Sequence, residues 1–129
     1  REQLARVMAS ADALLHGSAA ETFGLVVAEA LCAGLPLVVP DVGGAADLAA
    51  PAYAETYRAG DATACAQAAL RLLARDGAQL KQACYAAAQN KVLSQTQHFE
   101  RLFEAYAQLC NAPAVATQRP TAAEPPAHV

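Results

Sequence analysis

Large side chains are scarce in this sequence. Its 129 residues contain no Trp, three Phe, four Tyr and one Met. Alanine is the most frequent residue, so the 55% hydrophobic content overstates the area that the chain can bury. The length suits a single domain of ordinary size, and a core of this kind is thin for a domain that stands alone.

Basic residues are missing from much of the chain. The nine Lys and Arg residues all lie outside positions 7–57, and the formal net charge is −3. Nucleic-acid binding requires clustered Lys and Arg to displace counterions, so the sequence predicts no nucleic-acid partner. A diphosphate bound within 7–57 would need its counter-charges from elsewhere in the protein.

The cysteines form no disulfide or metal-binding pattern. Cys32, Cys65, Cys84 and Cys110 are far apart and include no Cys-x-x-Cys pair. They are interpreted as reduced, mostly buried thiols of a cytoplasmic protein. No apolar run reaches the roughly 18 residues of a membrane span, and no signal peptide is recognisable.

The composition divides the chain near residue 110. Residues 1–110 alternate periodic segments with Gly- and Pro-marked breaks, which predicts one folded domain. Residues 111–129 contain four prolines and no bulky side chain other than valine, which predicts a disordered Pro/Ala-rich tail. Because the chain begins at Arg1, we expect it to be a piece of a longer protein.

Two apolar strands and the helix between them predict the fold class. Residues 11–16 resemble a strand, 23–33 an apolar helix that ends at Gly34, and 36–40 a continuously apolar strand with prolines only at its ends. A strand–helix–strand unit of this kind has parallel strands and a right-handed crossover. We therefore predict an α/β fold, a Rossmann-like parallel sheet with flanking helices.

The loops after these two strands form the predicted ligand site. Residues 17–21 and 41–44 leave the carboxyl ends of neighbouring strands, where open α/β sheets bind ligands. Glu21 and the Gly43-Gly44 pair are therefore expected side by side, at a natural place for a phosphate-bearing ligand.

Further helices are predicted at both ends of the domain. Residues 1–10 favour a short helix, and another follows Gly44. An irregular stretch is expected before Asp61, and the structure of residues 48–60 stays open. Asp61 can cap a helix that extends to about residue 75, and Gly77 separates it from the next helix.

The last predicted helix is amphipathic. It follows Ser94-x-x-Gln97, which has the form of a capping box. Its apolar residues recur at helical spacing on one face and are Phe99, Leu102, Phe103, Tyr106 and Leu109.

Glu29 is the only charged residue between Phe23 and Gly34. A helix that is apolar all round is expected to be buried, and a buried carboxylate requires a partner. One interpretation is a salt bridge or backbone amides from a neighbouring element. The other is the hydroxyl pair of a bound ribose, as in dinucleotide-binding folds.

The start of this helix has the features of an anion site. Thr22 can act as the N-cap, which leaves the amides of Phe23, Gly24 and Leu25 at the positive end of the helix dipole. Gly24 would let a ligand approach the backbone closely. The alternative is that Gly24 only relieves crowding against a strand.

The segment HGSAAETFGLVVAEALCAGLPLVVPDVGG resembles the signature region of retaining glycosyltransferases of the GT-B fold, family 4. The pattern is specific because the flanking strand, Gly-x-Pro and Gly-Gly all stand at the family's spacing from Glu-x7-Glu. A looser likeness covers residues 1–110. The chain is thereby identified as part of the C-terminal, nucleotide-sugar-binding domain of such an enzyme. The matching positions are Glu21 and Glu29 of Glu-x7-Glu, Phe23-Gly24-Leu25, Gly34, Pro36, Val38-Val39 and Gly43-Gly44.

The resemblance implies a reaction and a role for each matching residue. Glu21 is implied to be the catalytic residue beside the donor hexose, and Glu29 to bind the ribose hydroxyls of the donor. The amides of Phe23, Gly24 and Leu25 are implied to face the sugar and the diphosphate. The implied reaction transfers a hexose from a UDP- or GDP-sugar to an acceptor with retention of configuration, without a cofactor or a metal.

The same resemblance implies partners that this chain does not contain. The phosphate-binding Arg and Lys and the acceptor-binding N-terminal domain precede this region in the family, so the isolated chain is expected to be inactive. Such enzymes are cytoplasmic, and the resemblance allows peripheral association with the inner face of the membrane through that domain. The alternatives are a sugar-nucleotide epimerase of GT-B type and a non-catalytic nucleotide-sugar-binding fragment.

Two features depart from the family pattern, and the role of a third stays open. The Asn-Gly hairpin common in the family is missing from residues 51–61, and Asp47 replaces a usual Glu. His16, at the end of the first strand, is interpreted either as a group that faces the donor sugar or as a plain strand-end residue. The sequence does not identify the sugar, the base, the acceptor or the oligomeric state.

Overall fold

The computed structural model describes residues 2–111, which divide into two units, residues 2–94 and the helix that begins at residue 95. The tail predicted over 111–129 lies outside the described residues, apart from Asn111. In chain order the elements are α1 (Glu2–Ser10), β1 (Leu14–Leu15), α2 (Leu25–Cys32), β2 (Leu37–Pro40), α3 (Gly44–Leu48), β3 (Ala54–Tyr57), α4 (Ala62–Leu73), α5 (Gly77–Lys91) and α6 (Gln95–Asn111).

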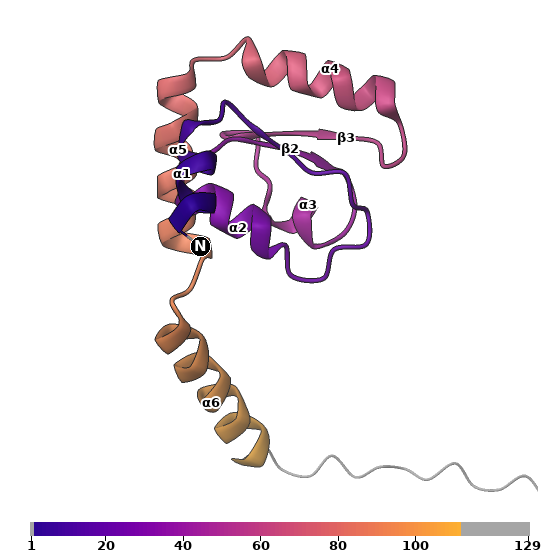
Figure 1. Cartoon of the computed structure of the whole chain (residues 1–129). Helices are drawn as coiled ribbons and strands as arrows, with labels where there is room; N and C mark the ends of the chain where they lie inside the picture. The colour runs from indigo at the N-terminus through magenta and orange to yellow at the C-terminus, as the bar shows by residue number, and fades with distance from the viewer. Residues whose placement is uncertain (1, 112–129) are drawn as a thin grey trace, which may run out of the picture. The chain divides into compact units, whose positions relative to one another are not determined.

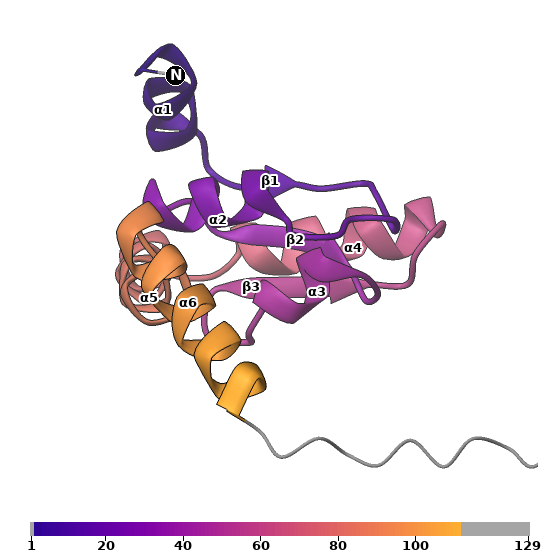
Figure 2. The same cartoon turned by 90° about the horizontal axis from the view of Figure 1, so that it is seen from below.

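The strands form a parallel sheet in the order β1-β2-β3. Leu14 of β1 lies opposite Leu37 of β2, which lies opposite Ala54 of β3. Figure 2 shows the three strands side by side, with consecutive strands as neighbours. The predicted α/β class and the parallel pairing of the first two strands are confirmed, although β1 is shorter than the predicted 11–16.

The irregular stretch expected before Asp61 contains β3, so that expectation is wrong for residues 54–57. This strand pairs with β2 along its whole length, from Ala54 opposite Leu37 to Tyr57 opposite Pro40. Its sequence, Ala-Glu-Thr-Tyr, includes two residue types that are uncommon in strands. Pairing with a fully buried neighbour outweighs that weak local preference.

Helices cover both faces of the sheet. Figure 1 shows α4 on one face and α2 and α3 on the other, with α5 beside α2. Alternate residues of β2 point to opposite faces: Leu37 and Val39 belong to the core cluster that contains Leu31 of α2, and Val38 to the cluster that contains Leu72 of α4. The sheet therefore separates two small cores.

Aspartates cap the two helices that follow the sheet. Asp61 Oδ1 accepts a hydrogen bond from the Ala64 amide at 2.9 Å. Asp76 Oδ1 accepts one from the Ala78 amide, also at 2.9 Å. The cap predicted at Asp61 is confirmed, and each carboxylate satisfies an amide that the first helical turn leaves unpaired.

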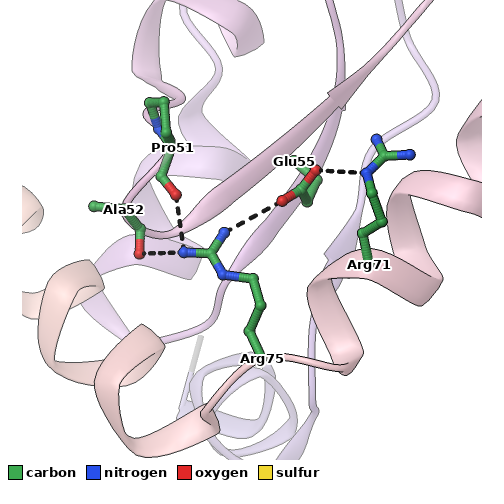
Figure 3. A network of polar contacts seen from close by, with 5 residues as sticks. All are labelled: Pro51, Ala52, Glu55, Arg71 and Arg75. Carbon is green, nitrogen blue, oxygen red and sulfur yellow. Dashed lines mark hydrogen bonds and ion pairs between the residues drawn. The ribbon is translucent and has the colours of Figure 1, made fainter.

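An arginine network holds the turn at the amino end of β3 (Figure 3). Arg75 Nη2 donates to the carbonyls of Pro51 at 2.8 Å and Ala52 at 3.0 Å. Arg75 Nη1 lies 3.3 Å from one carboxylate oxygen of Glu55, and Arg71 Nε lies 3.0 Å from the other. The carboxylate is thus shared by two guanidinium groups, which tie α4 and the residues just after it to the sheet.

The cysteines differ in their burial. Cys84 is buried, Cys65 is half-buried, and Cys32 and Cys110 are exposed, so the expectation of mostly buried thiols is wrong for the last two. All four are free. Burial raises the pKa of the Cys84 thiol to about 11, which keeps it protonated.

α6 forms the helix predicted after Ser94. Within it the rings of Phe99 and Phe103 stack with their centroids 6.3 Å apart. None of its residues is buried. Among the helices formed by residues 2–111, none combines the length and the apolar character that crossing a membrane requires.

Candidate functional site

The loops that leave β1 and β2 lie against each other, as predicted. The Gly44 amide donates to the Glu21 carbonyl at 2.8 Å. A Cβ atom on Gly44 would lie 2.6 Å from the Thr22 carbonyl oxygen, and one on Gly43 would lie 2.8 Å from that of Ala19. The Gly-Gly pair is therefore required for the close approach of two backbones at the carboxyl end of the sheet.

The Glu21 carboxylate is held by amides of its own loop. Its Oε1 accepts hydrogen bonds from the amides of Thr22 and Gly24, both at 3.1 Å. The bond from Gly24 is the largest cause that lowers the pKa of Glu21, followed by the amides of Phe23 and Thr22 and by the nearby His16. Glu21 is therefore ionised at neutral pH, in a defined orientation.

His16 lies beside this carboxylate at the end of β1. Its Nε2 is 3.9 Å from Glu21 Oε2, which is too far for a hydrogen bond. The same nitrogen is buried and has no hydrogen-bond partner among the described residues. The His16 side chain is 11% exposed and that of Glu21 27%. The pair thus places a nitrogen without a hydrogen-bond partner beside an ionised carboxylate.

The start of α2 differs from the prediction. The helix begins at Leu25, and the N-cap is Gly24 with φ 62°, not Thr22. The Gly24 amide, expected to face a ligand, donates to Glu21. A Cβ atom on Gly24 would also lie 3.2 Å from Leu48 Cδ1. Backbone conformation and packing together account for this glycine, because a left-handed cap disfavours any other residue.

Glu29 is exposed, and the expectation that it is buried is wrong. α2 buries only the face that carries Val27, Ala30 and Leu31, while Leu25, four residues before Glu29, is 72% exposed. No hydrogen bond or ion pair joins the Glu29 carboxylate to residues 2–111, so the structure offers no salt bridge for it. An apolar helix sequence indicated burial on all sides, whereas within residues 2–94 the side of α2 that carries Leu25 and Glu29 is left largely open.

The open side of α2 borders an apolar cavity of about 540 Å³. Glu29 is the charged residue of its lining. The other lining residues are Leu4, Ala5, Met8, Ala9, Leu25, Ala28, Cys32, Ala33, Tyr85 and Val92. Glu29 therefore combines a carboxylate without a partner in the described chain with an adjacent apolar surface.

The structure brings together some of the predicted site residues and separates others. Glu21, Gly24 and His16 form one cluster at the sheet edge. Leu25 and Glu29 share the open side of α2, and the Phe23 side chain is 78% exposed. The roles assigned to Glu21, Phe23, Gly24, Leu25 and Glu29 stay predictions.

Sequence reasoning gave no role to Tyr57, which contacts this cluster. The Tyr57 hydroxyl donates to the His16 carbonyl at 2.7 Å, across 41 residues of sequence. The sequence does contain one indication of this contact. Pro40, the last residue of β2, has no amide hydrogen to donate to the neighbouring strand, so another donor is needed there. In residues 2–111 no three His, Cys, Asp or Glu side chains gather as a metal site requires. The expectation of a reaction without a metal stays a prediction.

Residues 1–91 match the family model of the glycosyl transferases group 1, and the chain belongs to this family. The resemblance noted in the sequence is thereby confirmed. The match includes every predicted site residue and ends at the last residue of α5.

Two mannosyltransferases and a synthase are among the proteins similar to this chain. GDP-mannose-dependent alpha-mannosyltransferases of Mycobacterium tuberculosis and Mycolicibacterium smegmatis are 48% identical over 50 residues and 46% identical over 48 residues. These alignments cover 39% and 37% of this chain and 13% of each relative. The structure of sucrose-phosphate synthase from Thermosynechococcus elongatus matches 84% of this chain and 28% of that chain, with a TM-score of 0.71 and 28% identity. The chain thus spans a small part of each relative's length.

Proposed function

We propose that this chain forms part of the donor site of a hexosyltransferase that uses a UDP- or GDP-sugar and retains the anomeric configuration. The observation that carries the proposal is the family match over residues 1–91, which contains both Glu21 and Glu29. In the proposed site Glu21 is the catalytic residue, and Glu29 binds the ribose of the donor.

The environment of Glu21 supports its proposed role. An ionised carboxylate fixed by the Thr22 and Gly24 amides needs little rearrangement when positive charge develops on a sugar ring beside it. His16 adds a buried nitrogen on the same side as Glu21 Oε2. A sugar hydroxyl placed between the two groups would give His16 the partner that it otherwise lacks.

The surroundings of Glu29 support ribose binding. Its carboxylate is free to accept hydrogen bonds from two adjacent hydroxyls, because no group of residues 2–111 occupies it. The apolar wall formed beside it by Leu25 and Ala28 suits the uncharged part of a nucleoside. Donor phosphates would need cations from other parts of the protein, since positions 7–57 contain no Lys or Arg.

The names of the relatives direct the choice of donor. The two curated relatives are GDP-mannose-dependent, whereas the structural relative is a sucrose-phosphate synthase. We propose GDP-mannose as the first donor to test, with a UDP-hexose as the comparison.

The test uses the complete reading frame that encodes this chain. The protein is incubated with GDP-mannose or UDP-glucose and candidate acceptors, and NMR determines the anomeric configuration of the product. We expect transfer with retention by the encoded protein, and no release of nucleotide by the 129-residue chain alone. Calorimetry with GDP and UDP measures binding separately. A protein that binds a nucleotide sugar and neither transfers nor hydrolyses it would overturn the transferase proposal in favour of a binding role.

A further inference from the structure

The hydrogen-bond ladder between β1 and β2 is interrupted at its carboxyl end. The Leu14 amide donates to the Pro36 carbonyl at 2.8 Å, and the His16 amide donates to the Val38 carbonyl at 2.9 Å. In a parallel ladder with this register, the next bond would run from the amide of residue 40 to the His16 carbonyl. Residue 40 is Pro40, which has no amide hydrogen. The regular partner of the His16 carbonyl is therefore missing.

A side chain from the third strand takes the place of this amide. The Tyr57 hydroxyl donates to the His16 carbonyl at 2.7 Å, although β2 lies between β1 and β3. Tyr57 is itself fixed: it lies opposite Pro40 in the ladder, and its carbonyl accepts the Asp41 amide at 2.8 Å. Tyr57 is only 8% exposed, and burial is the first cause that raises the pKa of its phenol, so the hydroxyl keeps its proton.

We infer that Tyr57 is a positioning residue, whose hydroxyl replaces the amide that Pro40 lacks and thereby sets the His16 imidazole opposite Glu21. The His16 carbonyl lies where β1 ends and the loop to Glu21 begins, so a bond there limits the rotation of that strand end. Without this bond, the His16 backbone would be fixed only through its own amide. As far as catalysis is concerned, the inference rests on the proposed function, whereas the hydrogen bond itself can be tested without it.

The chain offers a matched control for removing the Tyr57 hydroxyl. Tyr53 is 3% exposed, and its hydroxyl donates to the Leu48 carbonyl, also at 2.7 Å. Tyr57→Phe and Tyr53→Phe thus remove the same group, with the same bond length, from similarly buried positions. Both variants are expected to lower Tm by similar amounts. Only Tyr57→Phe is expected to change the site.

The first measurement is made on the 129-residue chain by NMR. In Tyr57→Phe we expect the His16 carbonyl ¹³C resonance and the ring resonances of His16 to shift, and the His16 amide, which donates to the Val38 carbonyl, to exchange its hydrogen faster. Tyr53→Phe should leave these signals unchanged. Unchanged His16 signals in Tyr57→Phe, or equal shifts in both variants, would overturn the positioning role.

Replacing Pro40 provides a rescue experiment. Pro40→Ala restores an amide hydrogen at the position from which the regular ladder would donate to His16. In the Pro40→Ala background, the His16 shifts caused by Tyr57→Phe should fall to less than about half, since one donor can replace the other. Equal shifts in both backgrounds would show that Tyr57 acts through packing, which contradicts the inference. Because Pro40 is fully buried, Tm of each variant is measured alongside.

Kinetics of the complete encoded protein test the consequence for catalysis. Small displacements of reacting groups carry large penalties, so Tyr57→Phe should lower kcat/KM for transfer roughly tenfold. Binding of GDP and the activity of Tyr53→Phe should stay at the parent's values. If the NMR shifts appear and kcat/KM does not change, His16 has no part in transfer and the catalytic half of the inference is wrong. If the parent itself shows no transfer, the proposed function fails, and the hydrogen bond stands on the NMR result alone.

Discussion

The two ends of the parallel sheet use their polar side chains differently. At the amino end, Arg71 and Arg75 share the Glu55 carboxylate, and Arg75 also donates to two backbone carbonyls. At the carboxyl end, His16 Nε2 is buried without a partner in the described chain and stands 3.9 Å from Glu21. The polar side chains at the amino end therefore pair with one another, whereas His16 at the carboxyl end keeps a nitrogen without a hydrogen-bond partner.

This difference separates stability from function. A buried polar atom without a hydrogen bond costs about 1–3 kcal/mol. A buried polar group that the protein itself leaves unpaired is therefore a candidate place for a bound partner. We therefore expect substitutions at the amino end to change the free energy of unfolding, and substitutions at the carboxyl end and on the open side of α2 to change binding and turnover.

The largest effect is expected at Glu21. Glu21→Gln keeps an oxygen that can accept from the Gly24 amide, so the loop should retain its conformation. The negative charge is lost, and removing one fixed electrostatic group from a transition state typically lowers kcat by about 100-fold or more. We expect such a fall in kcat and kcat/KM of the complete encoded protein, with binding of bare GDP or UDP nearly unchanged. Equal losses in nucleotide binding and in kcat/KM would place Glu21 at the nucleotide.

A second variant contrasts the two glutamates. In the proposed site, Glu29→Ala would remove the hydrogen bonds to a ribose hydroxyl pair, each worth about 1.5–3 kcal/mol when one partner is charged. Nucleotide binding should therefore weaken at least about tenfold. Because Glu29 is exposed and has no partner in residues 2–111, the free energy of unfolding should change by less than about 0.5 kcal/mol. Calorimetry and urea unfolding are measured on the same variant. Normal nucleotide affinity together with a large loss of stability would contradict the ribose role.

Strong local patterns in the sequence predicted much of the fold. Val38 and Val39, with their apolar neighbours, form a strand that cannot be exposed, and Asp61 precedes a helix in a position that only a cap explains. β3 was missed because its partner strand, not its own composition, makes it a strand. Residues 54–57 can therefore be assigned to a strand only from their pairing with β2, not from their own composition.

The site was predictable where the backbone determines it. Gly43 and Gly44 indicated close contact between two loops, and the structure has that contact. The burial of Glu29 was predicted wrongly because periodicity describes a helix and says nothing of which of its sides a given chain covers. The bond between Tyr57 and His16 joins positions 41 residues apart, and Pro40 signals only that an amide is missing, not which side chain replaces it.

At the amino end, Arg75→Met should lower stability without altering function. The substitution removes donors to the Pro51 and Ala52 carbonyls and to Glu55. Because the Arg75 side chain is 33% exposed, water replaces part of what is lost, and we expect a loss of about 1 kcal/mol in urea unfolding. Affinity for nucleotide and kcat/KM should remain those of the parent. A large change in kcat/KM in Arg75→Met would contradict the view that the amino end of the sheet contributes to stability alone.

The pH dependence of stability reports on the Glu21 carboxylate. Hydrogen bonds from amides lower its pKa below the ordinary 4.5 in the folded chain. Its contribution to stability is therefore fully present above pH 4.5 and is lost as the pH falls through the folded-state pKa. In urea unfolding, the parent should exceed Glu21→Gln in stability at pH 7, and the difference should shrink as the pH falls below 4.5. A difference that does not vary with pH would show that the charge of Glu21 is not held by its loop.

The smallest effect is expected for Arg71→Met, which removes the second guanidinium from Glu55. The Arg71 side chain is 55% exposed and makes one ion pair, with Nε 3.0 Å from Glu55 Oε2. Exposed ion pairs contribute about 0–1 kcal/mol, and Arg75 still satisfies the carboxylate when Arg71 is replaced. Urea unfolding of Arg71→Met, Arg75→Met and the double variant should show a loss below about 0.5 kcal/mol for Arg71→Met alone. Its effect should grow when Arg75 is also absent, because Glu55 then has neither cation. Additive losses would show that the two arginines act independently, and the amino end would no longer be one network.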